Sequence, residues 1–474
     1  MLNKKLKKLL AVALVTAMTA SCFTACGSAD TDEDTSEASS DATSDDSEAG
    51  SDSEDSTSDA SVMEAPSTDG WTDDDKIYVY LWDADGESKV QNILDQMGDL
   101  ADYIEIVNLN CSGTDGEYQT TVDAALDGGD KYPSVILADE SVAKLYSETD
   151  LTLDLSSIGI SDEMTANMYS YTVDYGTYDG ALKAVSWQAT PGCLVYRADI
   201  AEEVLGTSDP DEVGALLSDW DAFMDVAQQM ADAGYYMVSG TNEIKYSVVN
   251  QRTNPWVDVA SDGSETLQLD DTLVTYLDLA KQLYDGGFTQ QSNTWDTAWA
   301  GSMAEGNVFC YFGCTWFIGS MEANCTEDSA NFGQWRTTTA PESYYWGGTY
   351  MCVGADTPNP ELAAYFVYMM CCNSETMYNL AADTGDFVNN TVAVDQLIAD
   401  GVGARDILGG QNPVETFAEA AKSINTQSTY LDSSILNYID TASSSYNTGT
   451  YSSTDEAIQY VKDQVAAEFD YIAQ

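Results

Sequence analysis

The segment from Lys76 to Trp82, KIYVYLW, is a short apolar run that suits a buried strand, and the turn sequence DADG follows it at residues 83–86. Residues 87–97 then carry apolar side chains at helical spacing. These side chains are Val90, Ile93, Leu94 and Met97. The segment therefore predicts a strand, a tight turn and a helix, which together form the first unit of an α/β sheet.

The same alternation continues along the chain. Residues 103–109 (YIEIVNL) predict a second strand, residues 118–126 a second helix and residues 134–138 (SVILA) a third strand. Strands that alternate with helices pair in parallel and carry helices on both faces of the sheet. Ligands of such folds lie beyond the carboxyl ends of the strands. Those ends hold Trp82, Asp83 and Asp139.

A second α/β region is predicted further along the chain. Its predicted strands are residues 194–196 and 308–312, and predicted helices lie at residues 222–230, 273–283, 362–370 and 458–469. About 400 residues remain once the first 75 are set aside, which exceeds one hydrophobic core and favours two domains.

The first residues have the pattern of an export signal. Residues 1–8 carry four lysines, and residues 9–20 form an apolar or small-residue run that is too short to span a bilayer. The following FTAC, which ends at Cys26, resembles the lipobox of bacterial lipoproteins, in which the cysteine is lipidated. Residues 1–25 are therefore predicted to be a signal peptide and Cys26 the point of lipid attachment. Attachment at Cys22 and a plain secretory signal are the alternatives.

An acidic segment follows the predicted attachment point. From Gly27 to Asp75 the chain holds 18 acidic residues, no basic ones, and otherwise mostly Ser, Thr and Ala. Such a segment cannot bury enough apolar surface to offset the entropy of ordering, and its like charges keep it extended. Residues 26–75 are therefore predicted to be a solvated tether.

The rest of the chain is also strongly acidic. Of the 80 acidic and 17 basic side chains of the protein, 62 and 13 lie between Lys76 and Gln474, which is a net charge of −49. Such a surface repels phosphate groups, so nucleic acid and anionic lipid are poor candidates for partners, and no nucleic-acid partner is predicted. Neutral or cationic solutes remain.

The chain contains no histidine, which removes Ser-His-Asp and Cys-His catalysis in their usual forms and the commonest zinc ligand. No metal site and no cofactor are predicted. Eight cysteines follow the predicted lipid attachment, mostly in apolar runs, and are predicted to be buried free thiols. They are Cys111, Cys193, Cys310, Cys314, Cys325, Cys352, Cys371 and Cys372.

Several segments together resemble the sugar-type extracellular solute-binding proteins, which are the receptors of ATP-binding-cassette importers. The segments are YPSVILAD (132–139), LTLDL (151–155), WQATPG (187–192) with YRADI (196–200), DWDAF (219–223), FGCTW (312–316), and WGGTY (346–350) with NPELA (359–363). Their order and spacing carry the resemblance, which spans nearly all of the chain after Lys76.

The resemblance implies a two-lobed α/β fold of the periplasmic-binding-protein type II class, in which each lobe is a sheet flanked by helices and the ligand lies in a cleft between the lobes. The chain is expected to pass through each lobe twice. Residues 76–187 and 341–373 are expected in the first lobe, and residues 188–340 and 374–474 in the second. The expected crossings lie near residues 187–190, 338–343 and 372–375.

A sugar presents weakly apolar C–H faces that lie well on aromatic rings, and hydroxyls that both donate and accept hydrogen bonds. A sugar receptor therefore needs Trp or Tyr beside Asp, Asn, Glu or Gln at loop ends that face a cleft. The candidate ligand-binding residues are Trp82, Asp83, Asp139, Glu243, Trp316, Tyr345, Trp346, Gly348, Asp386 and Asn389. The alternatives are core or hinge packing for the aromatic rings, and helix capping or a solvated turn for the polar groups.

The expected function is that of a lipid-anchored receptor, which closes around a mono- or oligosaccharide and delivers it to the permease of an ATP-binding-cassette transporter without catalysis. The protein is expected to be a monomer, anchored on the outer face of the cell membrane. Another small polar solute, such as a polyamine or a peptide, is the first alternative. An anchored glycoside hydrolase that uses two carboxylates and a purely adhesive surface protein are the others.

Overall fold

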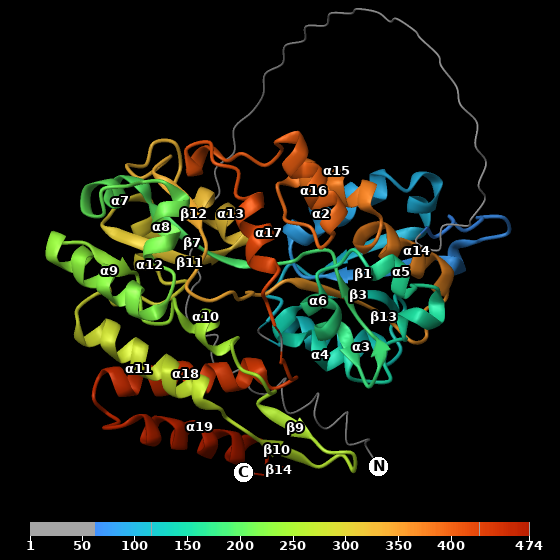
Figure 1. Cartoon of the computed structure of the whole chain (residues 1–474). Helices are drawn as coiled ribbons and strands as arrows, with labels where there is room; N and C mark the ends of the chain where they lie inside the picture. Colours follow the sequence, from blue (N-terminus) through green and yellow to red (C-terminus); the bar gives the residue numbers. More distant parts are fainter. Residues whose placement is uncertain (1–61, 115, 426, 474) are drawn as a thin grey trace, which may run out of the picture.

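The computed structural model of the chain describes residues 62–114, 116–425 and 427–473. The predicted signal peptide, Cys26 and most of the predicted tether lie outside the described residues. The described part forms two bodies, each built on a sheet of its own (Figure 1). This is the two-lobed α/β arrangement that the sequence predicts. Among the described helices, none has the length and apolar character needed to cross a membrane.

The first lobe is built on a five-stranded sheet with the strand order β2-β1-β3-β13-β6. Strand β1 (Ile77–Leu81) lies between β2 (Ile104–Asn108) and β3 (Pro133–Asp139) and is parallel to both. Strand β13 (Thr349–Val353) is antiparallel to β3 and to β6 (Val185–Ser186). The three predicted strands are therefore confirmed as a parallel set, and later segments of the chain add the antiparallel pair.

Helices cover both faces of this sheet because alternate residues of its strands point to opposite sides. Val79 belongs to a core cluster that contains the apolar side chains of α2 (Ala84–Asp95). Its neighbour Tyr80 belongs to a second cluster, which contains those of α3 (Glu117–Leu126). The strand period thus places a helix on each side of the sheet and leaves the strand ends free to carry polar residues.

The second lobe is built on a four-stranded sheet with the strand order β12-β7-β11-β8. Strand β7 (Gly192–Arg197) is antiparallel to β12 (Trp335–Thr338) and to β11 (Val308–Cys314), and β11 is parallel to β8 (Tyr236–Val238). The strands predicted at residues 194–196 and 308–312 are confirmed here as β7 and β11.

Helices of the second lobe come from the middle and from the end of the chain. Helix α11 (Asp271–Asp285) packs against α18 (Asp432–Asn447) and α19 (Thr454–Glu468), and the three lie together beside the second sheet (Figure 1). Helix α9 (Trp220–Ala233) packs against β8. The predicted helices at residues 222–230, 273–283 and 458–469 are confirmed.

Two segments connect the sheets directly. Residues 187–191 link β6 of the first sheet to β7 of the second, and residues 339–348 link β12 back to β13. Residues Pro191 and Tyr345 of these segments form an antiparallel bridge, so the two connections run side by side. The limits that the sequence suggests for the remaining lobe segments stay predictions.

Helices α14 (Pro360–Cys371) and α15 (Ser374–Thr384) both pack against α2 of the first lobe. Asn92 Nδ2 of α2 donates to Asp383 Oδ2 at 2.9 Å, which ties α15 to that surface. The chain therefore does not leave the first lobe near residues 372–375, where a crossing was expected. An apolar helical pattern shows that a helix is buried but does not show which lobe buries it.

The last residues of the predicted tether lie on the first lobe. The ring of Trp71 packs edge-on against Tyr103, with centroids 5.2 Å apart, and Met63 packs against the same core cluster. Residues before Lys76, among them Met63 and Trp71, therefore already pack on the first lobe.

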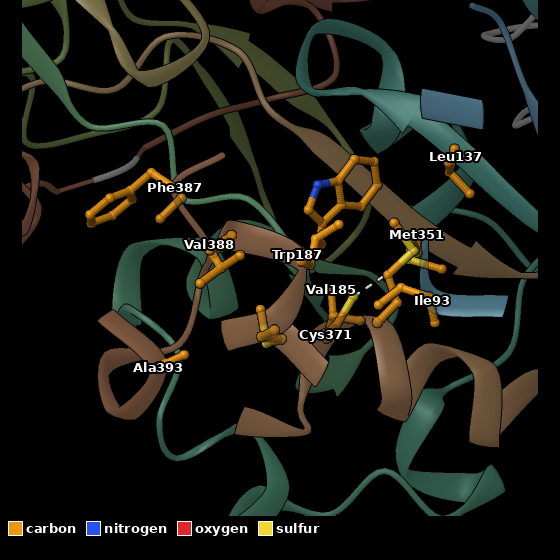
Figure 2. Packing of buried hydrophobic residues seen from close by; sticks show 14 of the residues in the cluster. Ile93, Leu137, Val185, Trp187, Met351, Cys371, Phe387, Val388 and Ala393 are labelled. Atoms are coloured by element: carbon orange, nitrogen blue, oxygen red, sulfur yellow. Dashed lines mark hydrogen bonds between the residues drawn. The ribbon is translucent and has the colours of Figure 1, made fainter. Parts of the chain in front are cut away.

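The core of the first lobe contains several of the cysteines. Figure 2 shows Cys371 beside Met351, with Val185, Trp187 and Ile93 around them. The Cys371 Sγ and Met351 Sδ atoms are 3.4 Å apart. The buried free thiols that the structure describes confirm the expectation for seven positions: Cys193, Cys310, Cys314, Cys325, Cys352, Cys371 and Cys372.

Candidate functional site

A cleft of about 870 Å³ opens between the two lobes. The first lobe lines it with Trp82 and Asp83, which follow β1, and with Asp139 at the end of β3. The second lobe lines it with Thr315 and Trp316, which follow β11. Each sheet thus contributes the carboxyl ends of its strands, which is where ligands of open α/β sheets bind.

Two carboxylates of the first lobe begin helices at the edge of the cleft. Asp83 Oδ1 accepts the backbone N–H of Gly86 at 2.8 Å and caps α2. Asp139 Oδ1 accepts the backbone N–H of Ser141 at 2.9 Å and caps α4 (Glu140–Ser147). Burial raises the pKa of Asp139, although the hydrogen bonds from Ser141 oppose that effect. Helix capping, the structural alternative, is thus present at both positions, and both residues also line the cleft.

Trp82 supplies an aromatic surface on the same wall. Its ring packs edge-on against Tyr118, with centroids 5.7 Å apart and planes at 77°. A Cβ at position 113 would lie 2.8 Å from Trp82 Cδ2, so Gly113 leaves the space that the indole occupies. The ring is half-buried and therefore fixed on one side and open on the other.

The second lobe and the connecting segment at residues 339–348 together supply a group of four aromatic rings. Trp316 Nε1 donates to the carbonyl of Trp346 at 3.0 Å, and the two rings meet edge to face with centroids 4.6 Å apart. Trp346 stacks on Tyr246 at 5.4 Å, and Trp295 stacks on Trp316 at 5.7 Å with planes inclined by 10°. All four rings line the cleft, so this wall offers flat apolar faces to a ligand.

Asp386 lies at the floor of the cleft in a network that uses both of its oxygens. Its Oδ2 accepts Gln188 Nε2 at 2.9 Å and lies 3.7 Å from Lys89 Nζ, and its Oδ1 accepts the Phe387 N–H at 2.9 Å. Burial lowers the pKa of Lys89, but the carboxylates of Asp386 and Asp85 outweigh that effect, so the pKa is raised and the ammonium stays charged.

A second cation of the cleft, Arg405, makes a two-pronged ion pair with Glu322. Arg405 Nε donates to Oε1 at 2.9 Å and Nη2 to Oε2 at 2.5 Å. Such paired hydrogen bonds hold the guanidinium plane in one orientation. The cations of the cleft are therefore engaged by protein carboxylates before any ligand arrives.

Gly347 and Gly348 bring the connecting segment close to the cleft. Their φ angles are +68° and +114°, a region that suits glycine and is strained for other residues. The carbonyl of Gly348 accepts the backbone N–H of Glu140 at 2.8 Å, which joins this segment to α4. Gly348 lines the cleft, and its contact with a ligand stays a prediction.

Tyr345 and Glu243 lie beside the cleft rather than in its wall. The Tyr345 hydroxyl donates to Glu140 Oε1 at 3.1 Å, and the ring is 7% exposed. The Glu243 carboxylate accepts Trp299 Nε1 at 2.7 Å and the Phe312 N–H at 3.1 Å. Burial raises the pKa of Glu243 to about 7, and the hydrogen bonds that it accepts oppose the shift.

Asn389 is the one candidate that the structure places away from the cleft and its neighbouring cavities. It is 0% exposed, and its Oδ1 accepts the Tyr169 N–H at 3.0 Å. Its Nδ2 donates to Thr172 Oγ1 at 2.8 Å and to the Ser186 carbonyl at 2.9 Å. The amide is therefore satisfied inside the first lobe, and the expectation that it meets a ligand is corrected to a structural role.

Several residues of the cleft were not among the sequence candidates. Among them are Tyr246, Trp295, Lys89, Gln188 and Arg405. Trp295 carried a signal, since the sequence NTWDTAW places it in a polar stretch after a helix, where a tryptophan has no amphipathic pattern to explain it. Among the described residues, no group of three or more His, Cys, Asp or Glu side chains gathers in a way that could hold a metal ion.

Comparison with solved structures shows the same fold. An extracellular solute-binding protein of family 1 superposes with a TM-score of 0.71 and 16% identity, over 83% of this chain and 99% of that chain. The galacto-N-biose-/lacto-N-biose I-binding protein of the ABC transporter from Bifidobacterium longum, in complex with lacto-N-biose, superposes with a TM-score of 0.65. Its sequence identity is 15%, over 84% of this chain and 98% of that chain. The ABC transporter associated binding protein from B. animalis subsp. lactis Bl-04, in complex with beta-1,6-galactobiose, superposes with a TM-score of 0.63. Its sequence identity is 18%, over 84% of this chain and 100% of that chain.

Sequence comparison identifies the family. No curated protein matches the chain. A family model described as bacterial extracellular solute-binding protein matches residues 100–403, which is more than half of the chain and includes parts of both lobes. Because the family model matches more than half of the chain, the chain belongs to the family of bacterial extracellular solute-binding proteins, and its two lobes and the cleft between them agree with this assignment.

Proposed function

We propose that the protein binds a carbohydrate in the cleft between its lobes and delivers it to the permease of an ATP-binding-cassette importer. The observation that carries the proposal is the presence of indole rings on both walls of one cleft, Trp82 on the first lobe and Trp295 and Trp316 on the second, with Trp346 on the segment that connects them. A ligand held between such walls presents two flat, weakly apolar faces, as a sugar ring does.

The polar groups of the cleft suit hydroxyls. Carboxylates, an amide and hydroxyls surround the rings, and they supply both donors and acceptors. Examples are Asp83, Asp139, Ser141, Ser433 and Asn437. Sites that bind small molecules commonly combine aromatic walls with a few placed polar groups. The sugars named with the two bifidobacterial structures support the choice of a carbohydrate for this chain.

Binding is proposed to proceed through closure of the two lobes about the segments that connect them. Closure of this kind around a ligand is an established motion of periplasmic binding proteins. A ligand drives closure only if it binds the closed state more tightly than the open one. Contacts to both walls at once provide that difference, because only the closed state brings both walls against one ligand.

The protein is proposed to act as a monomer, held at the outer face of the cell membrane by lipid on Cys26. The family match supports an extracellular position. The basic, apolar and small-residue pattern before Cys26 supports export and lipidation. The acidic residues after Cys26 support a tether that spaces the lobes from the membrane.

A thermal unfolding assay of the unlipidated protein tests the proposal. Mono- and oligosaccharides of several configurations are each added in excess, with polyamines and short peptides as competing classes. A true ligand at 100 times its dissociation constant adds about 2.7 kcal/mol to the free energy of unfolding. Stabilisation by a saccharide without cleavage products supports the proposal. Stabilisation by none of the saccharides contradicts it.

A cationic solute such as a polyamine is the second candidate, because the cleft holds more carboxylates than cations. Asp83, Asp85, Asp139 and Asp386 line it, against Lys89 and Arg405. The same assay separates the two candidates, since a polyamine receptor is stabilised by spermidine and by no neutral sugar. Release of cleaved sugar would instead indicate the glycoside hydrolase.

A further inference from the structure

A second polar cavity, here called the side cavity, lies in the second lobe and has a volume of about 420 Å³. It is lined by the loop at residues 289–294, by residues 241–242 after β8, and by side chains of α11 and α18. Its volume is within the range of about 300–1,000 Å³ that is usual for small-molecule sites. Every residue that lines the side cavity carries a hydroxyl, an amide or a carboxylate.

A smaller cavity of about 210 Å³, here called the connecting cavity, lies between the side cavity and the cleft. It shares Tyr246, Trp295 and Trp346 with the cleft. It shares Asn242, Thr294 and Asp440 with the side cavity. The three cavities are therefore neighbours in a series, which leads from the aromatic wall of the cleft into the second lobe.

One loop forms part of the wall of all three cavities. Its residues from Gln291 to Thr294 line the side cavity, and Trp295 lines the connecting cavity and the cleft. The loop is anchored at Ser292, whose backbone N–H donates to the Ser239 carbonyl at 3.1 Å. Gln291 and Trp295 have φ angles of +61° and +75°, which are strained conformations for residues other than glycine. Strain of this kind persists where a functional geometry requires it.

Three acceptor oxygens at this end of the series lack a hydrogen-bond partner among the described residues: Asn242 Oδ1, Asp440 Oδ1 and Asn447 Oδ1. Asn447 is 5% exposed, and its Nδ2 donates to Thr241 Oγ1 at 3.1 Å, so only its oxygen is unused. A buried acceptor without a partner is unfavourable, and a ligand that donates a hydrogen bond to it removes that cost. The unused atoms therefore call for a ligand rich in hydroxyl groups.

The charges of the residues that line the side cavity restrict the chemical class of the ligand further. Asp440 is the charged residue of the side cavity, and its Oδ2 already accepts Lys245 Nζ at 2.7 Å. No Lys or Arg is found among the described residues that line the side cavity, so an anion such as a phosphate has no counter-charge there. A cation gains little either, because the carboxylate is paired. A neutral polyhydroxylated group fits this lining.

We propose that the side cavity is a subsite for a further sugar residue of the ligand that occupies the cleft. The protein is then a receptor for a neutral oligosaccharide, one part of which stacks in the cleft while another passes Trp295 and enters the second lobe. This inference rests on the proposed function, since it requires that the cleft binds a carbohydrate.

The test uses Ser444→Trp, which places a large side chain at the wall of the side cavity. Ser444 is an exposed residue of α18, so the substitution is compatible with folding. Thr441→Trp is the matched control, since Thr441 is exposed on the same helix and lines none of the three cavities. Asn242→Ala removes one unused acceptor without adding bulk.

Each protein is titrated calorimetrically with neutral di-, tri- and tetrasaccharides of α-1,4-gluco, β-1,4-manno, β-1,4-xylo and β-1,3-galacto configuration. In the wild type, affinity is expected to rise about tenfold or more between the disaccharide and a longer member of the series that binds. Ser444→Trp is expected to lose that rise and to keep the disaccharide affinity, and Asn242→Ala to lose part of it. Thr441→Trp is expected to behave as the wild type.

The outcomes separate this inference from the proposed function. Saccharide binding without a gain for longer chains, or a gain that survives in Ser444→Trp, contradicts the subsite and leaves the cleft as a sugar site. Absence of binding by every saccharide contradicts the proposed function and the subsite together.

Discussion

Trp295 lies nearly parallel to Trp316, with ring centroids 5.7 Å apart and ring planes inclined by 10°. Trp295 is nevertheless 63% exposed, and its backbone φ is +75°. An exposed indole that is kept in a strained conformation at the edge of a cleft gains little for stability, which indicates a role in binding. We therefore expect the two rings to act as one stacking platform, with Trp316 supporting Trp295.

Replacing Trp316 by alanine tests the support of this platform. The change removes the ring under Trp295 and the hydrogen bond from Nε1 to the Trp346 carbonyl. Affinity for the stabilising saccharide is expected to fall about tenfold or more, which corresponds to about 1.4 kcal/mol, with folding retained. Trp71→Ala is the control, because Trp71 lies on Tyr103 of the first lobe and does not line the cleft. Unchanged affinity in Trp316→Ala would remove that residue from the site.

Replacing Trp295 by glycine separates binding from stability. Glycine adopts a φ of +75° without strain, and the exposed ring buries little surface, so the free energy of unfolding is expected to stay constant or to rise. Saccharide affinity is expected to fall, because the exposed face of the platform is lost. Urea unfolding and calorimetric titration of the same sample measure both quantities. A marked loss of stability would show that the ring serves the fold instead.

Replacing Gly348 by alanine tests the conformation of the connecting segment. A Cβ at this position would meet Thr190 at an ordinary contact distance of 3.5 Å, so the cost comes from the φ of +114° rather than from space. The free energy of unfolding is expected to fall by about 1–3 kcal/mol. Gly301→Ala is the matched control: it lies within helix α12 (Thr297–Ala304) with open space around its Cβ, and is expected to stabilise the protein by about 1 kcal/mol.

The pH dependence of the free energy of unfolding tests the burial of Glu140. Burial raises the pKa of Glu140 to about 8, and the neighbouring carboxylates of Asp139 and Asp432 add to the shift. Hydrogen bonding from Tyr345 and the charge of Arg252 oppose it. Because the pKa is raised in the folded state, the contribution of this group is fully present below its unfolded pKa of about 4.5 and is lost as the pH rises through about 8.

Glu140→Gln isolates that contribution, since glutamine still accepts the Tyr345 hydroxyl but does not ionise. The variant is expected to lose less stability than the wild type between about pH 5 and about pH 9, as measured by urea unfolding. Equal losses in the two proteins would show that the surroundings of Glu140 do not disfavour its ionised form.

Much of the fold follows from local patterns in the sequence. The run KIYVYLW and the strands after it alternate with amphipathic helices, and this alternation fixes a parallel sheet with polar residues at the strand ends. Asp83 and Asp139 were found in this way, because a strand end and a helix start coincide at both. Their position at the cleft follows from the parallel pairing of the strands, which the local sequence pattern predicts.

The remaining features depend on contacts between distant parts of the chain. The amide of Asn389 is a group that can bind sugar hydroxyls. It is instead buried in the first lobe, where it forms hydrogen bonds with Tyr169, Thr172 and Ser186, all more than about 200 residues earlier. Trp295 has no strand or helix pattern around it, and its neighbour Trp316 comes from another element. Helix α15 is a further example, because its apolar face does not show that the helix packs against α2.

Small-angle X-ray scattering of the unlipidated protein, with and without the saccharide that stabilises it most, measures closure of the cleft most directly. Contacts to Trp82 on one lobe and to Trp295 and Trp316 on the other are expected to draw the lobes together. The radius of gyration is therefore predicted to decrease on addition of the saccharide and to remain unchanged in Trp316→Ala at the same concentration. A radius that stays constant in the wild type at saturating saccharide would contradict binding by closure between the lobes.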